Sequence, residues 1–290
     1  MIKRVLILLL AIALPVAARG QAVPFVYIPS SADNLALGAS HVATPFHAPL
    51  EGHLFEAGIG KTLWQTKGAG YNLTTYAARV SIVPQLTAGI SVTTNSMAEI
   101  NIYSENGQPT GTAQPNEMCA AASLSYSPME GLGLYAAGKY IRSALTDSHE
   151  GHAAAFDAGV TYSIGHIITV GVRAENVGQK IDYGYGAYSL PTTYKAGIYG
   201  NWPLAAKHAV ELAADAGLMP AGSAALASIG TGYIFNNMIA VRCGAHISAK
   251  ADIMPTFFSV GAFFASDIFD FGAAYLTAAD TFTLSARFKL

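Results

Sequence analysis

Polar and apolar residues alternate without interruption over the last ten positions of the chain, 281–290. Apolar residues from Phe282 to Leu290 take one parity, and threonine, serine, arginine and lysine take the other. Because successive side chains of a strand point to opposite faces, this pattern predicts a strand with one apolar and one polar face. Such a strand fits a transmembrane β-barrel, with lipid outside and a polar lumen inside, or a soluble sandwich.

The same alternation recurs along the chain from residue 53 onward. It predicts thirteen earlier strands, at 53–63, 71–83, 86–97, 116–126, 132–143, 152–163, 166–175, 192–202, 208–218, 224–234, 238–248, 256–265 and 268–276. With the terminal strand the number is fourteen, and bacterial single-chain barrels have an even number of antiparallel strands.

The lengths of the connections favour the barrel over the sandwich. Short turns are predicted near 84–85, 127–131, 164–165, 203–207, 235–237 and 266–267. The two long connections, 98–115 and 176–191, both fall at the opposite ends of the strands. Outer-membrane barrels have short periplasmic turns and longer extracellular loops. We therefore predict an all-β, 14-stranded antiparallel transmembrane barrel over 53–290.

Composition agrees with a lipid-exposed surface. Apolar residues make up 52% of the chain and charged residues only 12%, about half the usual charged share. A soluble protein with so few charges would have little with which to cover its surface. The net charge of −2 gives no reason to expect nucleic acid as a partner. Outer-membrane lipid is the expected partner.

The first 21 residues are typical of a secretory signal peptide. Lys3 and Arg4 precede an apolar run over 5–18, and small residues follow it. The run is too short for a comfortable membrane span, although a retained anchor helix is the alternative. We predict export to the bacterial outer membrane.

Residues 22–52 differ from the rest of the chain. Four prolines lie within 23–50, and no long alternation occurs there. We expect a segment at or inside the periplasmic mouth of the barrel. An extra short strand around 35–42 is the alternative.

Many charged or titratable residues fall on the inward parity of the predicted strands. Eight are candidate lumen-lining residues: Arg79, Lys139, Arg173, Glu211, Asp215, Arg242, His246 and Arg287. Five further inward charges accompany them: Glu56, Asp157, Glu175, Lys195 and Asp270. They suit a permeation path, a binding site or a paired polar filling, and we favour the filling because buried charges persist when they are paired.

Seven glycines share this inward parity: Gly58, Gly60, Gly171, Gly230, Gly232, Gly244 and Gly261. Glycine in strands marks bends or close approach of another group. We expect them to allow curvature in a narrow barrel, with a bend that opens a side gate as the alternative.

Motifs for catalysis or metal binding are weak. His149 and His152 flank Glu150, but a zinc-binding helix needs histidines four residues apart, and these lie in a predicted loop. Inward serine, histidine and aspartate residues have no spacing that brings them together as a catalytic set. Cys119 faces inward and Cys243 outward, so we predict two free thiols. We expect no enzymatic activity, no metal and no cofactor.

Four stretches carry a resemblance to a known family. They are Ile28–Ala32 with Leu35–Ala39, the loop 106–111, the strand segment 138–143, and 172–178 with Leu190-Pro191 and Gly197-Ile198. In these stretches the chain resembles the PorV/PorQ family, outer-membrane barrels of the FadL-like fold in bacteria with type IX secretion. The resemblance runs, with gaps, from about residue 26 to the end.

The resemblance implies an accessory barrel of type IX protein secretion. Its partners would be the type IX translocon barrel and the C-terminal signal domains of secreted cargo, contacted by the extracellular loops and rim. FadL-like relatives instead admit small hydrophobic molecules, which is the alternative function.

Overall fold

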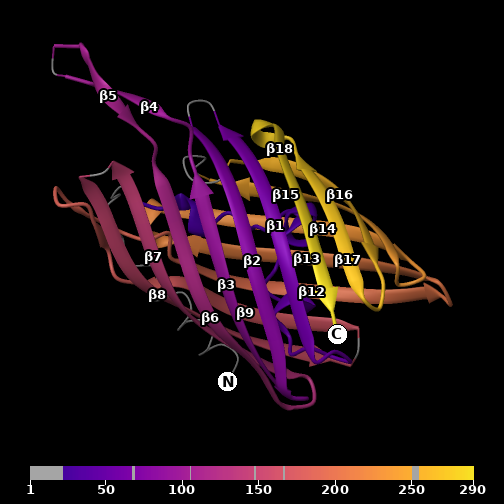
Figure 1. Cartoon of the computed structure of the whole chain (residues 1–290). Coiled ribbons are helices and arrows are strands. Elements are labelled where there is room, and N and C mark those ends of the chain that lie inside the picture. The colour runs from indigo at the N-terminus through magenta and orange to yellow at the C-terminus, as the bar shows by residue number, and fades with distance from the viewer. Residues whose placement is uncertain (1–21, 67–68, 105, 147, 166, 250–254) are drawn as a thin grey trace.

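The computed structural model describes residues 22–66, 69–104, 106–146, 148–165, 167–249 and 255–290. Its main body is a closed antiparallel barrel of fourteen strands (Figure 1). In barrel order these are β1 (Phe55–Thr66), β2 (Ala69–Val83), β3 (Leu86–Ser96), β6 (Asn116–Met129), β7 (Leu132–Thr146), β8 (His149–Ile164), β9 (Ile168–Gly178), β12 (Thr193–Ala205), β13 (His208–Met219), β14 (Ala224–Phe235), β15 (Ile239–Ser248), β16 (Phe257–Ala265), β17 (Phe269–Leu276) and β18 (Thr281–Lys289). The predicted fold class and strand number are confirmed.

Pairing of the first and last barrel strands closes the ring. Ala57 of β1 lies opposite Phe288 of β18, and Leu63 lies opposite Phe282. Neighbouring strands therefore leave no free edge, which is required where lipid offers no hydrogen-bonding partner.

Side-chain burial follows the predicted parity. On β18, Phe282 and Phe288 are exposed on the outer surface, whereas Thr281 and Thr283 are fully buried inside. The same holds on β16, where Phe258 and Val260 are exposed and Ser259 is buried. Apolar side chains thus face lipid, and polar ones face the lumen.

The two long connections, predicted without strands, each contain a small hairpin. Strands β4 (Ile100–Tyr103) and β5 (Pro109–Ala113) pair with each other and project beyond the barrel (Figure 1). Strands β10 (Ile181–Asp182) and β11 (Ala187–Tyr188) form the second hairpin. Both lie at the same end of the barrel, which the predicted orientation makes the extracellular end.

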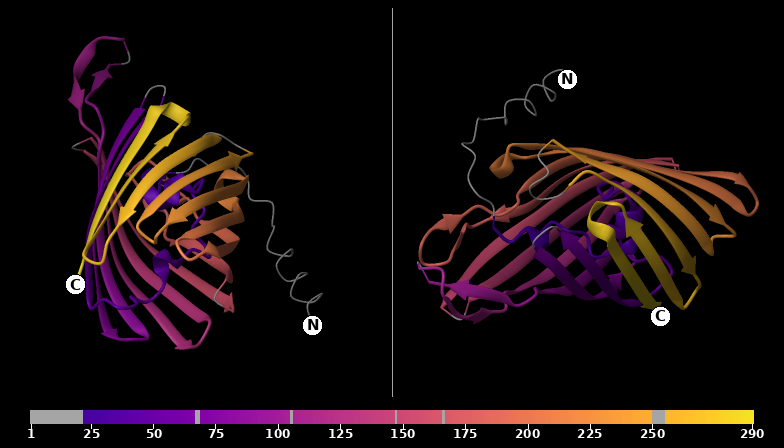
Figure 2. Two further views of the ribbon diagram at one scale, coloured as in Figure 1. Left: turned by 90° about the vertical axis from the view of Figure 1, so that its right-hand side faces the viewer. Right: turned by 90° about the horizontal axis from the view of Figure 1, so that it is seen from above.

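Residues 22–50, which we call the plug, lie inside the ring of strands (Figure 2). The plug contains three short helices, η1 (Pro24–Val26), α2 (Ala32–Ala36) and η2 (Pro45–His47). The alternative of a strand around 35–42 is wrong, because the Leu35 N–H bonds to the Ser31 carbonyl and closes a helical turn.

Two short helices, η3 (Pro220–Gly222) and η4 (Ala278–Asp280), complete the elements at the extracellular end. Among the described residues, no helix is long and apolar enough to cross a membrane. The predicted signal peptide, 1–21, lies outside the described residues.

Candidate functional site

The plug passes close to the barrel wall at positions where the wall carries glycine. A Cβ added at Gly230 would lie 2.6 Å from both the Cα and the carbonyl oxygen of Leu37. One added at Gly244 would clash with the backbone of Gly38, which has a φ of +69° that suits glycine. Gly60 approaches the Ser30 carbonyl in the same way. These inward glycines admit the plug backbone, which is a more specific role than the curvature predicted from sequence.

The other inward glycines make room for side chains as well as for the plug. A Cβ at Gly261 would lie 2.7 Å from the Cβ of Ala36 in the plug. At Gly58 it would lie 2.9 Å from the Cγ of Arg287, and Gly232 lies against the side chains of Glu211 and Arg242. A Cβ added at Gly171 would lie 3.3 Å from the carbonyl oxygen of Val42 in the plug.

An apolar cluster fills the extracellular half of the lumen. Plug residue Phe25 packs there with residues at the extracellular ends of the strands, and it is 1% exposed. Trp64 and Phe257 meet edge to face, with ring centroids 6.2 Å apart. The Ala22 N–H donates to the Ser189 carbonyl in the extracellular loop at 3.2 Å. We call this set the extracellular apolar cluster; it also contains Val23, Leu73, Ile141, Ile181, Met219 and Leu276.

A first group of charges ties the plug to the wall below this cluster. Asp33 of α2 accepts hydrogen bonds from Arg242 at 2.5 Å and from Arg287 at 3.3 Å. Arg242 also pairs with Glu211 and lies over the ring of Phe263, 4.6 Å from its centroid. Asp33 thus joins two strands, β15 and β18, that are far apart in sequence from α2.

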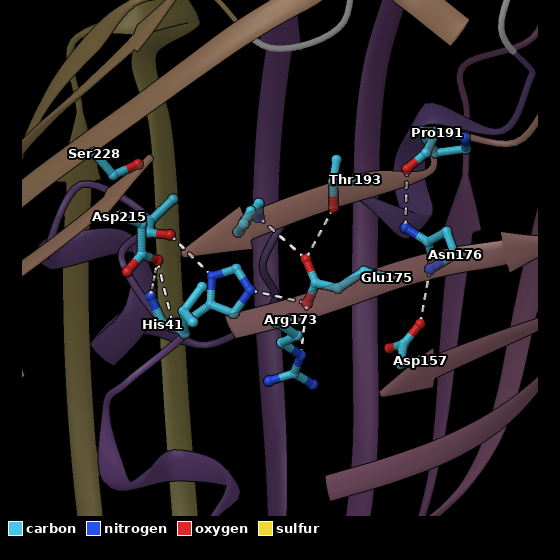
Figure 3. A network of polar contacts seen from close by, with 12 residues as sticks. His41, Asp157, Arg173, Glu175, Asn176, Pro191, Thr193, Asp215 and Ser228 are labelled. Atoms are coloured by element: carbon cyan, nitrogen blue, oxygen red, sulfur yellow. Dashed lines mark hydrogen bonds and ion pairs between the residues drawn. The ribbon is translucent and has the colours of Figure 1, made fainter. Parts of the chain in front are cut away.

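A second group holds the middle of the plug (Figure 3). Asp215 accepts the backbone N–H groups of His41 at 2.7 Å and Val42 at 3.1 Å. Glu175 is the centre of the group: it lies 2.9 Å from His41 Nε2, 3.0 Å from Arg173 Nε and 3.1 Å from Lys195 Nζ.

The remaining predicted lumen-lining residues are also placed inside the barrel. Arg79 lies 3.8 Å from Glu56 and donates to the carbonyl of Ala48 in the plug. Lys139 forms a 2.7 Å ion pair with Asp157.

His246 lies 2.9 Å from the Ser228 hydroxyl and stacks on Phe257, with centroids 5.3 Å apart. All eight predicted residues therefore have a polar or charged partner.

Sequence reasoning missed the plug side of these contacts, Asp33 and His41. The signal was present, since Asp33 is the single Asp, Glu, Lys or Arg within 23–50. A lone charge in a segment that lies inside a charged lumen is expected to face an opposite charge.

Below the charged groups the lumen is hollow. A cavity of about 820 Å³, which we call the vestibule, is lined by plug residues 42–45 and 47–49 and by the periplasmic turns around Gln85, Glu130 and Gly165. Tyr135 and Arg173 line the vestibule from the barrel wall.

The His-Glu-Gly-His stretch lies in a strand, and its prediction as a loop is wrong. His149 begins β8, whose pairing with β7 extends as far as Thr146. Arg142 donates two hydrogen bonds to Glu150, at 2.6 and 2.7 Å, and His152 lies 3.1 Å from the same carboxylate. Within the described ranges, no three His, Cys, Asp or Glu residues are placed to hold a metal ion.

Both thiols are free, as predicted. Cys119 is buried in the lumen and Cys243 is exposed on the outer surface, so the barrel wall separates them.

Comparisons with known proteins rest on structure. No family model matches the chain, and no curated protein sequence matches it. The toluene transporter TbuX of Ralstonia pickettii aligns over 88% of this chain and 95% of its own, with 13% identity and a TM-score of 0.59. The toluene transporter TodX of Pseudomonas putida aligns over 88% of this chain and 96% of its own, with 11% identity and a TM-score of 0.57.

The chain has the FadL-like barrel fold. A FadL homologue from Pseudomonas aeruginosa also matches, with 10% identity, a TM-score of 0.47, and coverage of 81% of this chain and 89% of that one. The TbuX and TodX structures agree with the barrel fold that the sequence resemblance implies. No matching family model or curated sequence points to PorV/PorQ in particular.

The filled lumen of this FadL-like barrel restricts what can pass. Polar solutes would have to cross the extracellular apolar cluster, in which Phe25, Trp64 and Leu73 are at most 1% exposed. The charged groups below it are paired. Space for a solute lies in the vestibule and in a second cavity of about 230 Å³ lined by Asp33, Arg242 and Arg287. The arrangement is that of a closed barrel with an apolar outer entrance.

Proposed function

We propose that the protein resides in the bacterial outer membrane and admits small hydrophobic molecules. The FadL-like fold, shared with two barrels described as toluene transporters, supports this proposal. The composition of the lumen supports it more directly, because the plug replaces the continuous water column of an open pore.

The observation that carries the proposal is the apolar character of the outer half of the lumen. Val23 and Phe25 of the plug occupy the space between apolar residues of the wall and the loop residues Ile181 and Leu190. Apolar contacts of this kind are non-directional, so an apolar solute can replace the plug side chains without leaving polar groups unpaired. A sugar or an ion has no comparable partners there.

Uptake of radiolabelled toluene by intact Gram-negative cells tests this function. The host should lack its own barrels of this fold, and initial rates should be compared with and without the chain. We expect faster uptake with the native chain and with Phe25→Leu, and slower uptake with Phe25→Asn, which places an amide in the apolar cluster. Equal uptake with and without the chain would contradict the proposal.

A second function, an accessory role in type IX secretion, is favoured by one feature besides the sequence resemblance. The β4–β5 hairpin projects beyond the barrel, and Ile100, Ile102 and Tyr103 are exposed on it. An exposed apolar hairpin suits contact with a protein partner, here the translocon barrel or the signal domains of cargo.

Removing the chain from its host distinguishes the two functions. If surface proteins with type IX signals are exported as before, the secretion role is excluded. If export fails while toluene uptake is unchanged, the secretion role replaces the first proposal.

A further inference from the structure

The guanidinium of Arg173 lies at the inner end of the vestibule, which we call its roof, and has N–H donors available for a ligand. Its Nε atom lies 3.0 Å from Glu175, and the guanidinium turns away from that carboxylate (Figure 3). In the part of the chain that the structure describes, no hydrogen-bond acceptor is paired with its two terminal nitrogens. A guanidinium offers five N–H donors in a planar fork, so several donors remain for a ligand.

The position of Arg173 is fixed by its surroundings. The guanidinium lies over the ring of Tyr135, 4.2 Å from the centroid, and that ring contacts His47 of the plug at 4.8 Å between centroids. The side chain of Arg173 is 5% exposed. A stacked and buried arginine loses little conformational entropy when it binds, which favours recognition of a planar anion.

Glu175 neutralises the positive charge of Arg173 only in part. Lys195 lies 3.1 Å from the other carboxylate oxygen of Glu175, so that carboxylate already has a cationic partner. Glu51 and Glu130, the acidic residues that line the vestibule, are exposed and lie at its periplasmic side. The roof of the vestibule is therefore its most positive part.

His47 adds a neutral polar group beside Arg173. Burial and the neighbouring Arg173 hold the pKa of His47 well below its usual value, so the ring is uncharged at pH 7. An uncharged imidazole keeps one N–H donor and carries no second charge.

We infer that the vestibule binds a small organic carboxylate, with Arg173 receiving the carboxylate group. Arginine and carboxylate match in a planar, two-bond geometry. The cavity of about 820 Å³ is in the range of small-molecule sites. Its walls include Pro45, Pro84 and Leu134, which suit the apolar part of an organic acid better than a bare inorganic anion. The inference does not depend on which molecules cross the barrel.

Binding of benzoate to the full chain in detergent tests the inference. Benzyl alcohol has nearly the same shape without the charge, and inorganic phosphate has the charge without the ring. Isothermal titration should show benzoate binding at least roughly tenfold more tightly than either, the ratio expected for a charge-assisted pair. Equal affinities of benzoate and benzyl alcohol would overturn the inference, and so would phosphate binding as tightly as benzoate.

Variants locate the site. Arg173→Met should weaken benzoate binding at least roughly tenfold and leave benzyl alcohol unchanged. The matched control, Arg142→Met, removes an arginine from the outer surface and should leave both unchanged. Benzoate affinity that survives Arg173→Met in a barrel still folded by heat-modifiable electrophoresis would overturn the assignment.

The native chain provides a second measurement in case Arg173→Met does not fold. Added sodium chloride should weaken benzoate binding while benzyl alcohol binding stays constant, because chloride competes with the carboxylate for the guanidinium of Arg173. Benzoate binding that does not respond to salt would overturn the inference.

Discussion

Replacing Gly230 with alanine should loosen the plug while leaving the barrel intact. The added Cβ would lie 2.6 Å from the Cα and the carbonyl oxygen of Leu37 and 2.7 Å from its carbonyl carbon. These are backbone atoms, so no side chain can turn away to make room, and the plug itself must shift. Alanine is otherwise well tolerated in a strand.

Overpacking of this kind costs about 1–3 kcal/mol. A cost of about 2 kcal/mol on the docked plug raises the population of the open plug roughly 30-fold. The amides that hold the plug to the wall would report the change. Gly38 donates to the Ser259 hydroxyl at 3.2 Å, and His41 donates to Asp215 at 2.7 Å.

Hydrogen exchange measured by mass spectrometry is the assay. Peptides covering 33–44 should exchange roughly 30-fold faster in Gly230→Ala, with the barrel strands unchanged. The control is Gly138→Ala, since a Cβ at Gly138 would meet nothing within 4 Å. Unchanged exchange in 33–44, or the same acceleration in the control, would refute the reasoning.

Three further predictions concern charge, lipid and thiols. Arg242→Met leaves the carboxylates of Asp33 and Glu211 buried without the arginine that they share, and should lower the free energy of unfolding by about 3–5 kcal/mol in denaturant. Adding Asp33→Asn should recover part of this loss. Losses that simply add in the double variant would show that Arg242 and Asp33 are not coupled. Val260→Arg puts a charge on the lipid face of β16 and should lower the free energy of unfolding in liposomes by about 2–4 kcal/mol. An unchanged free energy of unfolding would mean that this face is not in lipid. An apolar maleimide should label Cys243 in membranes and leave Cys119 unlabelled until unfolding, and the reverse order would contradict the assigned faces.

Sequence reasoning located the barrel strands because their cause is local. Lipid on one side and lumen on the other impose a period of two, which can be read within ten residues. The strand predicted at 86–97 spans Leu86–Ser96 in the structure, and the strand predicted at 208–218 spans His208–Met219.

The plug could not be placed in this way because its contacts are not local. Gly38 bonds to Ser259, which is 221 residues away, and nothing in the pattern around either residue indicates the other. The glycines that admit the plug have the spacing of ordinary strand residues, so the sequence alone does not distinguish curvature from close approach.

The β4–β5 hairpin was missed although its signals were present. Ile100 and Ile102 alternate with polar Asn101, and Asn106-Gly107 is a common turn pair. Gly107 has a φ of +74°, as such a turn requires. A strand of four residues is too short to span a membrane, so it does not belong to the pattern of spanning strands.

Conductance in a planar lipid bilayer tests most directly whether the plug closes the lumen. The full chain should show no stable ionic current, because the extracellular apolar cluster and the paired charges leave no continuous water path. A chain that lacks residues 22–50 should conduct as an open barrel. A steady current through the full chain, equal to that of the shortened one, would contradict the account.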